Sequence, residues 1–387
     1  MKAAALAEIL ASYRNNLGFT LKEVGKWSRL SVSTINDYET GKIQRPDFGK
    51  LEQLCKVYGV SLSVLLASIE ERPSIHFRLN DFDVDSEDME EIDKAVAFID
   101  DYENVLDLLE DEGNISLQRT YPNEPRLNWF ELGERIAVSE RRYWGYMSTQ
   151  PVDLLPLAQK EDIFVNLLRL PDSIDGFFYM PPAGKTFWIL INARKPGTRK
   201  NFTLAHEYSH FLLDRDQGQY VCNVFDDKSD PIESRANAVA ARLLVPRPAL
   251  DSLVSKKKKF TPNDVIELCH VFGVSSYVIG YRLKAEGFIS ERKRKQLSEY
   301  AYNEDPVYRV HLSSMDKKFQ HPELDLSFRS ADSINSVQQD FLVMVKKAYE
   351  QGKVTFSRAL SYFRNRNNLA QLLEISPKDA EELEHAF

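Results

Sequence analysis

The segment HEYSH at residues 206–210 is the feature that most restricts how this chain can fold. His206 and His210 are four residues apart, so on an α-helix both imidazoles project from the same face and can share one metal ion. Apolar residues flank the segment in TLAHEYSHFLL and would bury the other faces of such a helix. The segment therefore predicts a rigid, largely buried helix that carries a metal site.

Zinc is the metal that this spacing favours. Three protein ligands leave one zinc position open for water and lower the pKa of that water towards neutrality. Glu207, beside the first histidine, can then take up the proton as general base and return it to the leaving amine during peptide hydrolysis. The competing interpretation is the polar face of an ordinary helix. We predict a zinc metalloendopeptidase of the HExxH type.

The motif leaves the third metal ligand open. The downstream candidates are Asp214, Asp216, Glu233 and His270. We predict Glu233, because it begins a second helix after a loop of about twenty residues, and two helices can then converge on one ion. Asp214 ranks second, since it lies four residues after His210 and can face the same ion. In a purely structural role, Glu233 would only cap its own helix near the positive end of the dipole.

The segments RKNFTLAHEYSHFLL and ESRANAVAARLLVP closely resemble the ImmA/IrrE family of metallopeptidases. That family pairs a helix of the RFTLAHELGH type with E-x-x-A-N-x-F-A-x-x-L-L-x-P, and the resemblance covers about residues 160–285. Ser209 replaces the common Gly, and Val239 replaces the common Phe. The resemblance implies a zincin-like fold and a repressor-type protein substrate. The zinc ligands that it implies are His206, His210 and Glu233, with Glu207 as the catalytic acid/base.

The first 70 residues predict a compact domain of five short helices. Thr20 and Glu23 form a capping-box signature, and Gly residues separate several of the periodic segments. Helices are expected over 3–17, from Thr20 through LKEVGKWSR, from Ser31 or Ser33 to Gly41, and at about 47–58 and 61–68.

The segment TLKEVGKWSRLSVSTINDYETGKIQRP resembles the XRE/Cro-type helix-turn-helix family over about residues 4–68, although Leu21 stands where that family often has Gln. In this geometry the third helix enters the major groove of double-stranded DNA. Asn36 could read adenine through two hydrogen bonds. The other expected base contacts are Ser31, Ser33 and Thr34, and the expected phosphate contacts are Lys22, Lys42 and Arg45.

Charge leaves a second interpretation of this domain open. Residues 1–70 contain 9 Lys or Arg against 7 Asp or Glu, a weak basic excess that also suits a module for dimerisation or protein recognition. The net charge of −8 comes from residues 81–112, which hold 15 acidic residues and one Lys; the rest of the chain has a net charge of +6. We expect DNA binding, as a homodimer on paired half-sites.

The remaining sequence predicts an α+β protein that is mostly helical. Three short β-type segments, at 162–170, 175–180 and 185–192, predict a small sheet. The strand at 186–191 is expected beside the metal-site helix, either with a free edge that could pair with substrate or as a plain core strand. The expected units are the helix-turn-helix domain at 1–70, an acidic helical connector at 71–155, the peptidase domain at 156–289, and a helical region of unknown role at 290–387.

Composition excludes a membrane protein, since no window approaches about 18 consecutive apolar residues. The three cysteines are far apart and in no C-x-x-C spacing, which favours a reducing compartment, and we expect a cytoplasmic protein. The leading hypothesis is a DNA-binding regulatory peptidase that cleaves a transcriptional repressor in stress or mobile-element control. The alternative is a non-hydrolytic XRE-type regulator or antitoxin whose peptidase-like domain is a sensor or partner platform.

Overall fold

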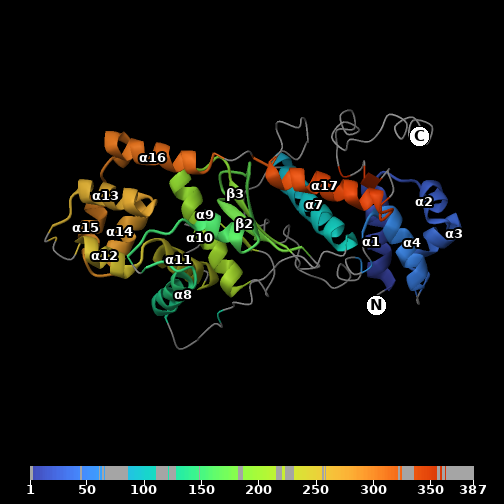
Figure 1. Ribbon diagram of the computed structural model, residues 1–387, viewed down its shortest axis with the longest axis horizontal. Coiled ribbons are helices and arrows are strands. Elements are labelled where there is room, and N and C mark those ends of the chain that lie inside the picture. Colours follow the sequence, from blue (N-terminus) through green and yellow to red (C-terminus); the bar gives the residue numbers. More distant parts are fainter. Residues whose placement is uncertain are drawn as a thin grey trace.

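The computed structural model shows a mostly helical protein with one small mixed sheet, which confirms the predicted fold class (Figure 1). The N-terminal helices lie at one end of the molecule, and the sheet lies between them and a group of helices at the other end. The structure describes residues 3–43, 46–60, 62, 65, 86–109, 121, 128–147, 149–181, 186–214, 220–222, 231–254, 257, 259–320, 323–324, 335–354, 358–359 and 362.

The N-terminal domain contains four described helices around its own apolar core. They are α1 (Ala3–Asn16), α2 (Leu21–Ser28), α3 (Val32–Glu39) and α4 (Phe48–Tyr58). The capping box predicted at Thr20 and Glu23 is present, and it fixes the start of α2. Leu10, Ile35 and Leu54 are fully buried where these helices meet. The expected fifth helix lies mostly outside the described residues.

Four strands form the sheet, in the order β1-β3-β2-β4. They are β1 (Ile163–Leu168), β2 (Gly176–Tyr179), β3 (Phe187–Asn192) and β4 (Tyr220–Cys222), of which β4 was not predicted from the sequence. β3 pairs in parallel with β1 and antiparallel with β2, and all six of its residues are buried. The hypothesis of a free edge on this strand is therefore wrong: β3 is the core strand.

One face of the sheet is covered by α7 (Ser86–Leu108) and α17 (Ser336–Glu350) (Figure 1). The acidic stretch thus forms a real helix with a buried apolar stripe. Its Phe98 meets Trp188 of β3 and Phe341 of α17 edge-on, with ring centroids 6.1 Å and 5.2 Å away. The predicted connector and C-terminal region therefore share one core with the sheet. The domain boundaries at 70, 155 and 289 stay a prediction.

The other face of the sheet packs against α10 (Gly197–Leu213), which holds the HEYSH segment. Around α10 lie α8 (Trp129–Tyr143), α9 (Leu154–Lys160) and α11 (Pro231–Leu244). The far end is built from α12 (Arg247–Val254), α13 (Pro262–Phe272), α14 (Ser276–Ala285), α15 (Glu291–Ser298), the 3-10 turn η2 (Tyr302–Glu304) and α16 (Pro306–Lys318). None of the described helices is long and apolar enough to span a lipid bilayer.

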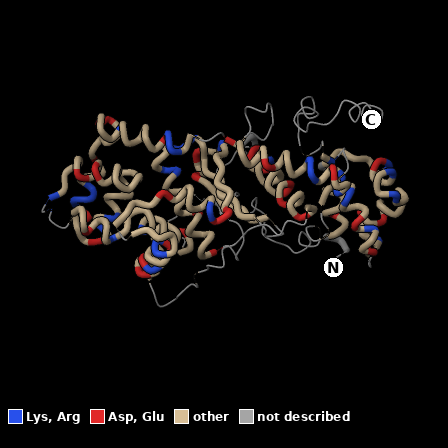
Figure 2. The backbone as a smooth tube through the Cα atoms, viewed as in Figure 1, with Lys and Arg blue, Asp and Glu red and all other residues tan. Residues whose placement is uncertain are grey.

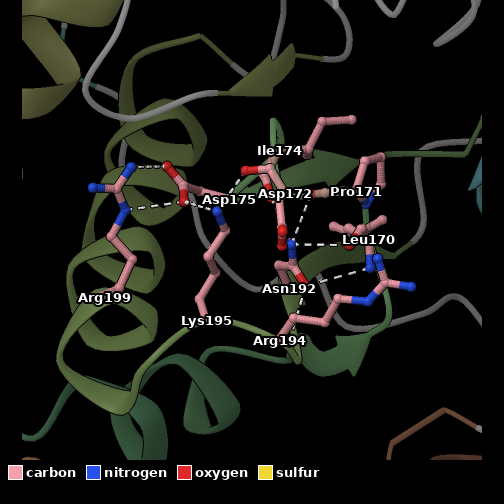
Figure 3. Close-up of polar contacts among 9 residues, drawn as sticks. All are labelled: Leu170, Pro171, Asp172, Ile174, Asp175, Asn192, Arg194, Lys195 and Arg199. Carbon is pink, nitrogen blue, oxygen red and sulfur yellow. Dashed lines mark hydrogen bonds and ion pairs between the residues drawn. The ribbon is translucent and has the colours of Figure 1, made fainter. Parts of the chain in front are cut away.

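A buried carboxamide fixes the connection between the sheet and α10 (Figure 3). The Nδ2 of Asn192, at the end of β3, donates to the carbonyl oxygens of Leu170, Pro171 and Ile174 at 3.1, 2.9 and 2.8 Å. One residue further along the chain from Ile174, the carboxylate of Asp175 accepts from Nε of Arg199 in the first turns of α10 at 2.9 Å. These bonds hold the start of α10 against the sheet.

A short C-terminal segment links the N-terminal domain to the rest of the molecule. The hydroxyl of Tyr362 donates to the carbonyl oxygen of Gly59, just after α4, at 3.0 Å. Arg358 lies over the Tyr362 ring at 4.1 Å and donates to Asp101 of α7 at 2.8 Å. Because Arg358 and Tyr362 are both buried, these bonds are shielded from water and hold the N-terminal domain close to α7.

We predict that Gly59→Ala destabilises the protein more than Gly18→Ala. Both glycines have a positive φ, 63° and 69°, which costs any L-residue about 1 kcal/mol. A Cβ at Gly18 would meet nothing within 4 Å, whereas one at Gly59 would lie 2.2–2.7 Å from the side chain of Arg358. Thermal unfolding should show a larger loss for Gly59→Ala, because only this variant also disrupts the Arg358 contact. Equal losses would show that the contact contributes nothing.

Candidate metal centre and DNA-binding surface

The metal site begins with the position of α10 in the fold. His206, Glu207 and His210 are completely buried, since the sheet, α8 and α11 surround this helix. Ser209, where the related family commonly has Gly, is also buried, and its hydroxyl donates to the carbonyl oxygen of Ala205 at 2.7 Å. The hydroxyl of Ser209 therefore has its hydrogen-bond partner within the helix. The replacement of Gly by Ser at this position leaves the two histidines in place.

Three predicted ligands converge on one point. Nε2 of His206 lies 3.0 Å from Nε2 of His210, and the carboxylate of Glu233 lies 2.9 Å from the first and 3.4 Å from the second. Glu233 is in the first turn of α11, so two helices supply the three groups, as the sequence predicted. Among the described residues, this is the cluster whose donor atoms could hold a metal ion.

The spacing of these atoms fits zinc. In a tetrahedral site with zinc–nitrogen distances of about 2.0–2.1 Å, neighbouring ligand atoms lie about 3.3 Å apart. Nδ1 of His210 faces the carboxylate of Asp214 at 2.9 Å, and Nδ1 of His206 faces Oδ1 of Asn237 at 3.1 Å. If each Nδ1 carries the proton that these acceptors need, both Nε2 atoms present lone pairs to each other and to Glu233. A metal ion between them would satisfy these lone pairs.

The charges of these groups also favour a positive charge at the centre of the cluster. Burial alone would lower the pKa of His210, but its bonds to Asp214 and Glu233 outweigh burial and raise the pKa to about 10. For Glu233, burial would raise the pKa, whereas the two histidines lower it well below its usual range. A buried carboxylate is stable only beside a positive charge, which a metal ion or a proton can provide.

Asp214, the second-ranked candidate for the third ligand, has a different role. Its carboxylate lies on the Nδ1 side of His210 and also forms a buried ion pair with Arg235 of α11. It therefore lies on the opposite side of the His210 ring from Glu233, where it can orient the imidazole. Asp216 lies outside the described residues, and His270 lies on α13, where its Nε2 is 3.3 Å from the carbonyl oxygen of Val307.

Sequence reasoning missed Asn237 and Arg235. A signal for Asn237 was present, because it lies four residues after Glu233 and so occupies the same face of α11. The pairing of Arg235 with Asp214 depends on how α10 and α11 cross, which no local pattern shows. Glu140 of α8 also supports α10. Its carboxylate accepts hydrogen bonds from the hydroxyls of Tyr208 and Tyr121, each at 2.7 Å.

The predicted DNA-reading helix is α3, and α1 holds it in place. Arg14 of α1 makes a charged pair with Glu39 of α3, with Nε and Nη2 2.8 and 2.9 Å from its carboxylate oxygens. Ser31 is the N-cap of α3: its oxygen accepts from the N–H of Thr34 at 3.0 Å and lies 2.8 Å from the Thr34 hydroxyl. Both hydroxyls are thus already engaged in the cap, which weakens the prediction that they read bases.

The other predicted DNA contacts differ in exposure. Ser33 and Lys22 are exposed, and Asn36 is partly exposed on α3. Lys42 is also exposed, with Nζ 3.3 Å from Asp37, an ion pair that water screens strongly. Arg45 lies outside the described residues. Figure 2 shows basic and acidic residues interspersed along these helices, in agreement with the weak basic excess of the sequence.

We predict that Glu233→Ala weakens zinc binding more than Asp214→Asn. Loss of Glu233 removes a ligand, whereas loss of the Asp214 charge only releases the orientation of His210, which typically costs about 10–100-fold in metal affinity. Competition with a chromogenic chelator measures both affinities. The reverse order would transfer the ligand role to Asp214.

Two regions of the chain match known protein domains. Residues 158–284, which contain the sheet, α10 and α11, match the IrrE N-terminal-like domain of the M78 peptidases. Residues 5–67 match a helix-turn-helix domain. No curated protein matches the chain significantly. The chain therefore carries an IrrE N-terminal-like metallopeptidase domain, with a buried His-His-Glu cluster, behind an N-terminal helix-turn-helix DNA-binding domain.

Proposed function

We propose that this protein is a DNA-binding regulatory zinc metalloendopeptidase that hydrolyses a peptide bond in a specific protein. The observation that carries the proposal is the buried cluster of His206, His210 and Glu233 beside Glu207, in a chain that also has a helix-turn-helix domain. An HExxH pair with a carboxylate from a second helix is the ligand set of zinc peptidases.

In this proposal, different residues of the chain bind the metal, transfer the proton and orient the metal ligands. His206, His210 and Glu233 hold zinc, which when bound activates water and polarises the scissile carbonyl. Glu207, one residue after the first ligand, takes the proton from the attacking water and delivers it to the leaving amine. Asp214 and Asn237 keep the two imidazoles turned towards the metal, so that little reorganisation accompanies the reaction.

The partners follow from joining the two domains. A peptidase tethered to DNA acts most directly on another DNA-bound protein, and we propose a transcriptional repressor as substrate, cleaved in the cytoplasm under stress. Helix-turn-helix domains commonly bind paired half-sites as dimers, and we propose a homodimer on double-stranded DNA. The exposed Lys22 and Lys42 are suited to contact phosphates in that complex.

Burial of the site favours a second candidate function. His206, Glu207 and His210 have no exposed surface, and Glu233 is 8% exposed. A site closed in this way would also suit a non-hydrolytic regulator or antitoxin that uses zinc to stabilise a sensor domain. The two candidates differ in one respect: only the peptidase needs Glu207 for its effect in cells.

We predict that Glu207→Gln abolishes hydrolysis while zinc binding remains. Glutamine fills the same volume and cannot act as general base, and Glu207 is not one of the three ligands. New protein N-termini should be compared between cells that express the native chain and cells that express Glu207→Gln, with and without stress.

A terminus that appears only with the native chain would identify the substrate and establish the peptidase. The zinc content of both purified proteins, measured alongside, is the control for an intact site. If no terminus appears in either condition while the protein binds zinc and DNA, the non-hydrolytic regulator is correct.

We predict that Asn36→Ala costs about 1–3 kcal/mol on a cognate DNA site and relaxes the preference at one base pair. Asn36 lies on α3, and its amide can pair with the major-groove edge of adenine. Binding titrations on the cognate duplex and on duplexes changed at single positions measure the effect. An equal loss on all sequences would refute base reading by Asn36.

A further inference from the structure

We propose that Val32 determines part of the DNA sequence preference by contacting the methyl group of a thymine in the major groove. This inference rests on the proposed DNA binding through α3 and adds the chemistry that its first turn recognises. Thymine is the base whose major-groove edge carries a methyl group, so an apolar side chain at that edge distinguishes it from the other three.

The exposure of Val32 is the first observation. Val32 is the first residue of α3 and is 41% exposed, although the inward side of the same helix buries Ile35 completely and Tyr38 almost completely. The helix therefore has an apolar side chain on its outer side, in the turn that enters the groove first in this class of domain. Burial in the domain core does not explain a valine at this position.

One methyl group of Val32 faces α2. A Cβ built on Gly25 of α2 would lie 3.5 Å from Cγ2 of Val32, an ordinary van der Waals distance. A β-branched side chain in a helix has one strongly preferred χ1 angle. Because this preference already holds the side chain in one rotamer, the other methyl group can meet a partner at little entropic cost.

Three polar side chains near Val32 are engaged within the domain. The hydroxyls of Ser31 and Thr34 pair with each other at the cap, and the carboxylate of Asp37 pairs with Lys42 at 3.3 Å. Val32 consequently presents a methyl group beside polar groups that already have partners. Such a surface complements the C5-methyl of thymine better than it complements the donors and acceptors of the other bases.

The test replaces thymine with uracil, which removes only the methyl group. A preferred duplex is first selected from a random DNA library with the full-length native chain, and each thymine in it is then replaced singly by uracil. We expect one position at which uracil weakens binding about fourfold, the factor that corresponds to burial of one methyl group. At that position, Val32→Ala should bind the thymine duplex about fourfold more weakly than the native chain and should not distinguish thymine from uracil.

Val138→Ala is the matched control. Val138 lies on α8 in the peptidase domain and is 42% exposed, so the same substitution is made at the same exposure away from α3. This variant should keep the native preference for thymine, and both variants should retain the native thermal unfolding midpoint.

Three outcomes would contradict the proposal, and they are distinguishable. If Val32→Ala still prefers thymine over uracil at that position, another residue makes the contact. If the native chain is sequence-specific but uracil has no effect at any position, only the assignment of Val32 fails. If the native chain binds all sequences equally, both this inference and the proposed base reading by α3 fail.

Discussion

The arrangement of His206, His210 and Glu233 imposes the strictest physical requirement on this structure. The two Nε2 atoms lie 3.0 Å apart, and each lies 2.9–3.4 Å from an oxygen of Glu233, in the interior, where a buried carboxylate is costly unless a cation compensates it. Two helices must therefore be held at a fixed crossing, because a shift of about 1 Å in either would separate the donors. Much of the surrounding architecture can be understood as the support for that crossing.

That support comes from buried polar contacts as well as apolar packing. Asn192 and Asp175 fix the start of α10, Glu140 holds its middle through Tyr208, and the ion pair of Asp214 with Arg235 joins its end to α11. Each of these groups is buried and would be costly without its partner. The network therefore favours one arrangement of the helices over other compact ones.

The opposite face of the sheet connects the metal site to the DNA-binding domain. α7 packs on β3, and its Asp101 pairs with Arg358, which stacks on Tyr362 next to Gly59 of the N-terminal domain. The sheet thus has α10 on one face and the contacts to the N-terminal domain on the other.

Periodicity and spacing within short segments predict the local features: the helix of HEYSH, the cap at Thr20, three of the strands and the preference for Glu233 over Asp214. The fold was needed to show that Asp214 faces Nδ1 of His210, that Asn237 and Arg235 lie beside the cluster, and that β3 lies at the centre of the sheet. The reason is that strand order and helix crossing are set by contacts between residues distant in sequence. Local spacing ranked Glu233 above Asp214 but left both open as the third ligand, and the crossing of α10 and α11 places Glu233 against the two Nε2 atoms.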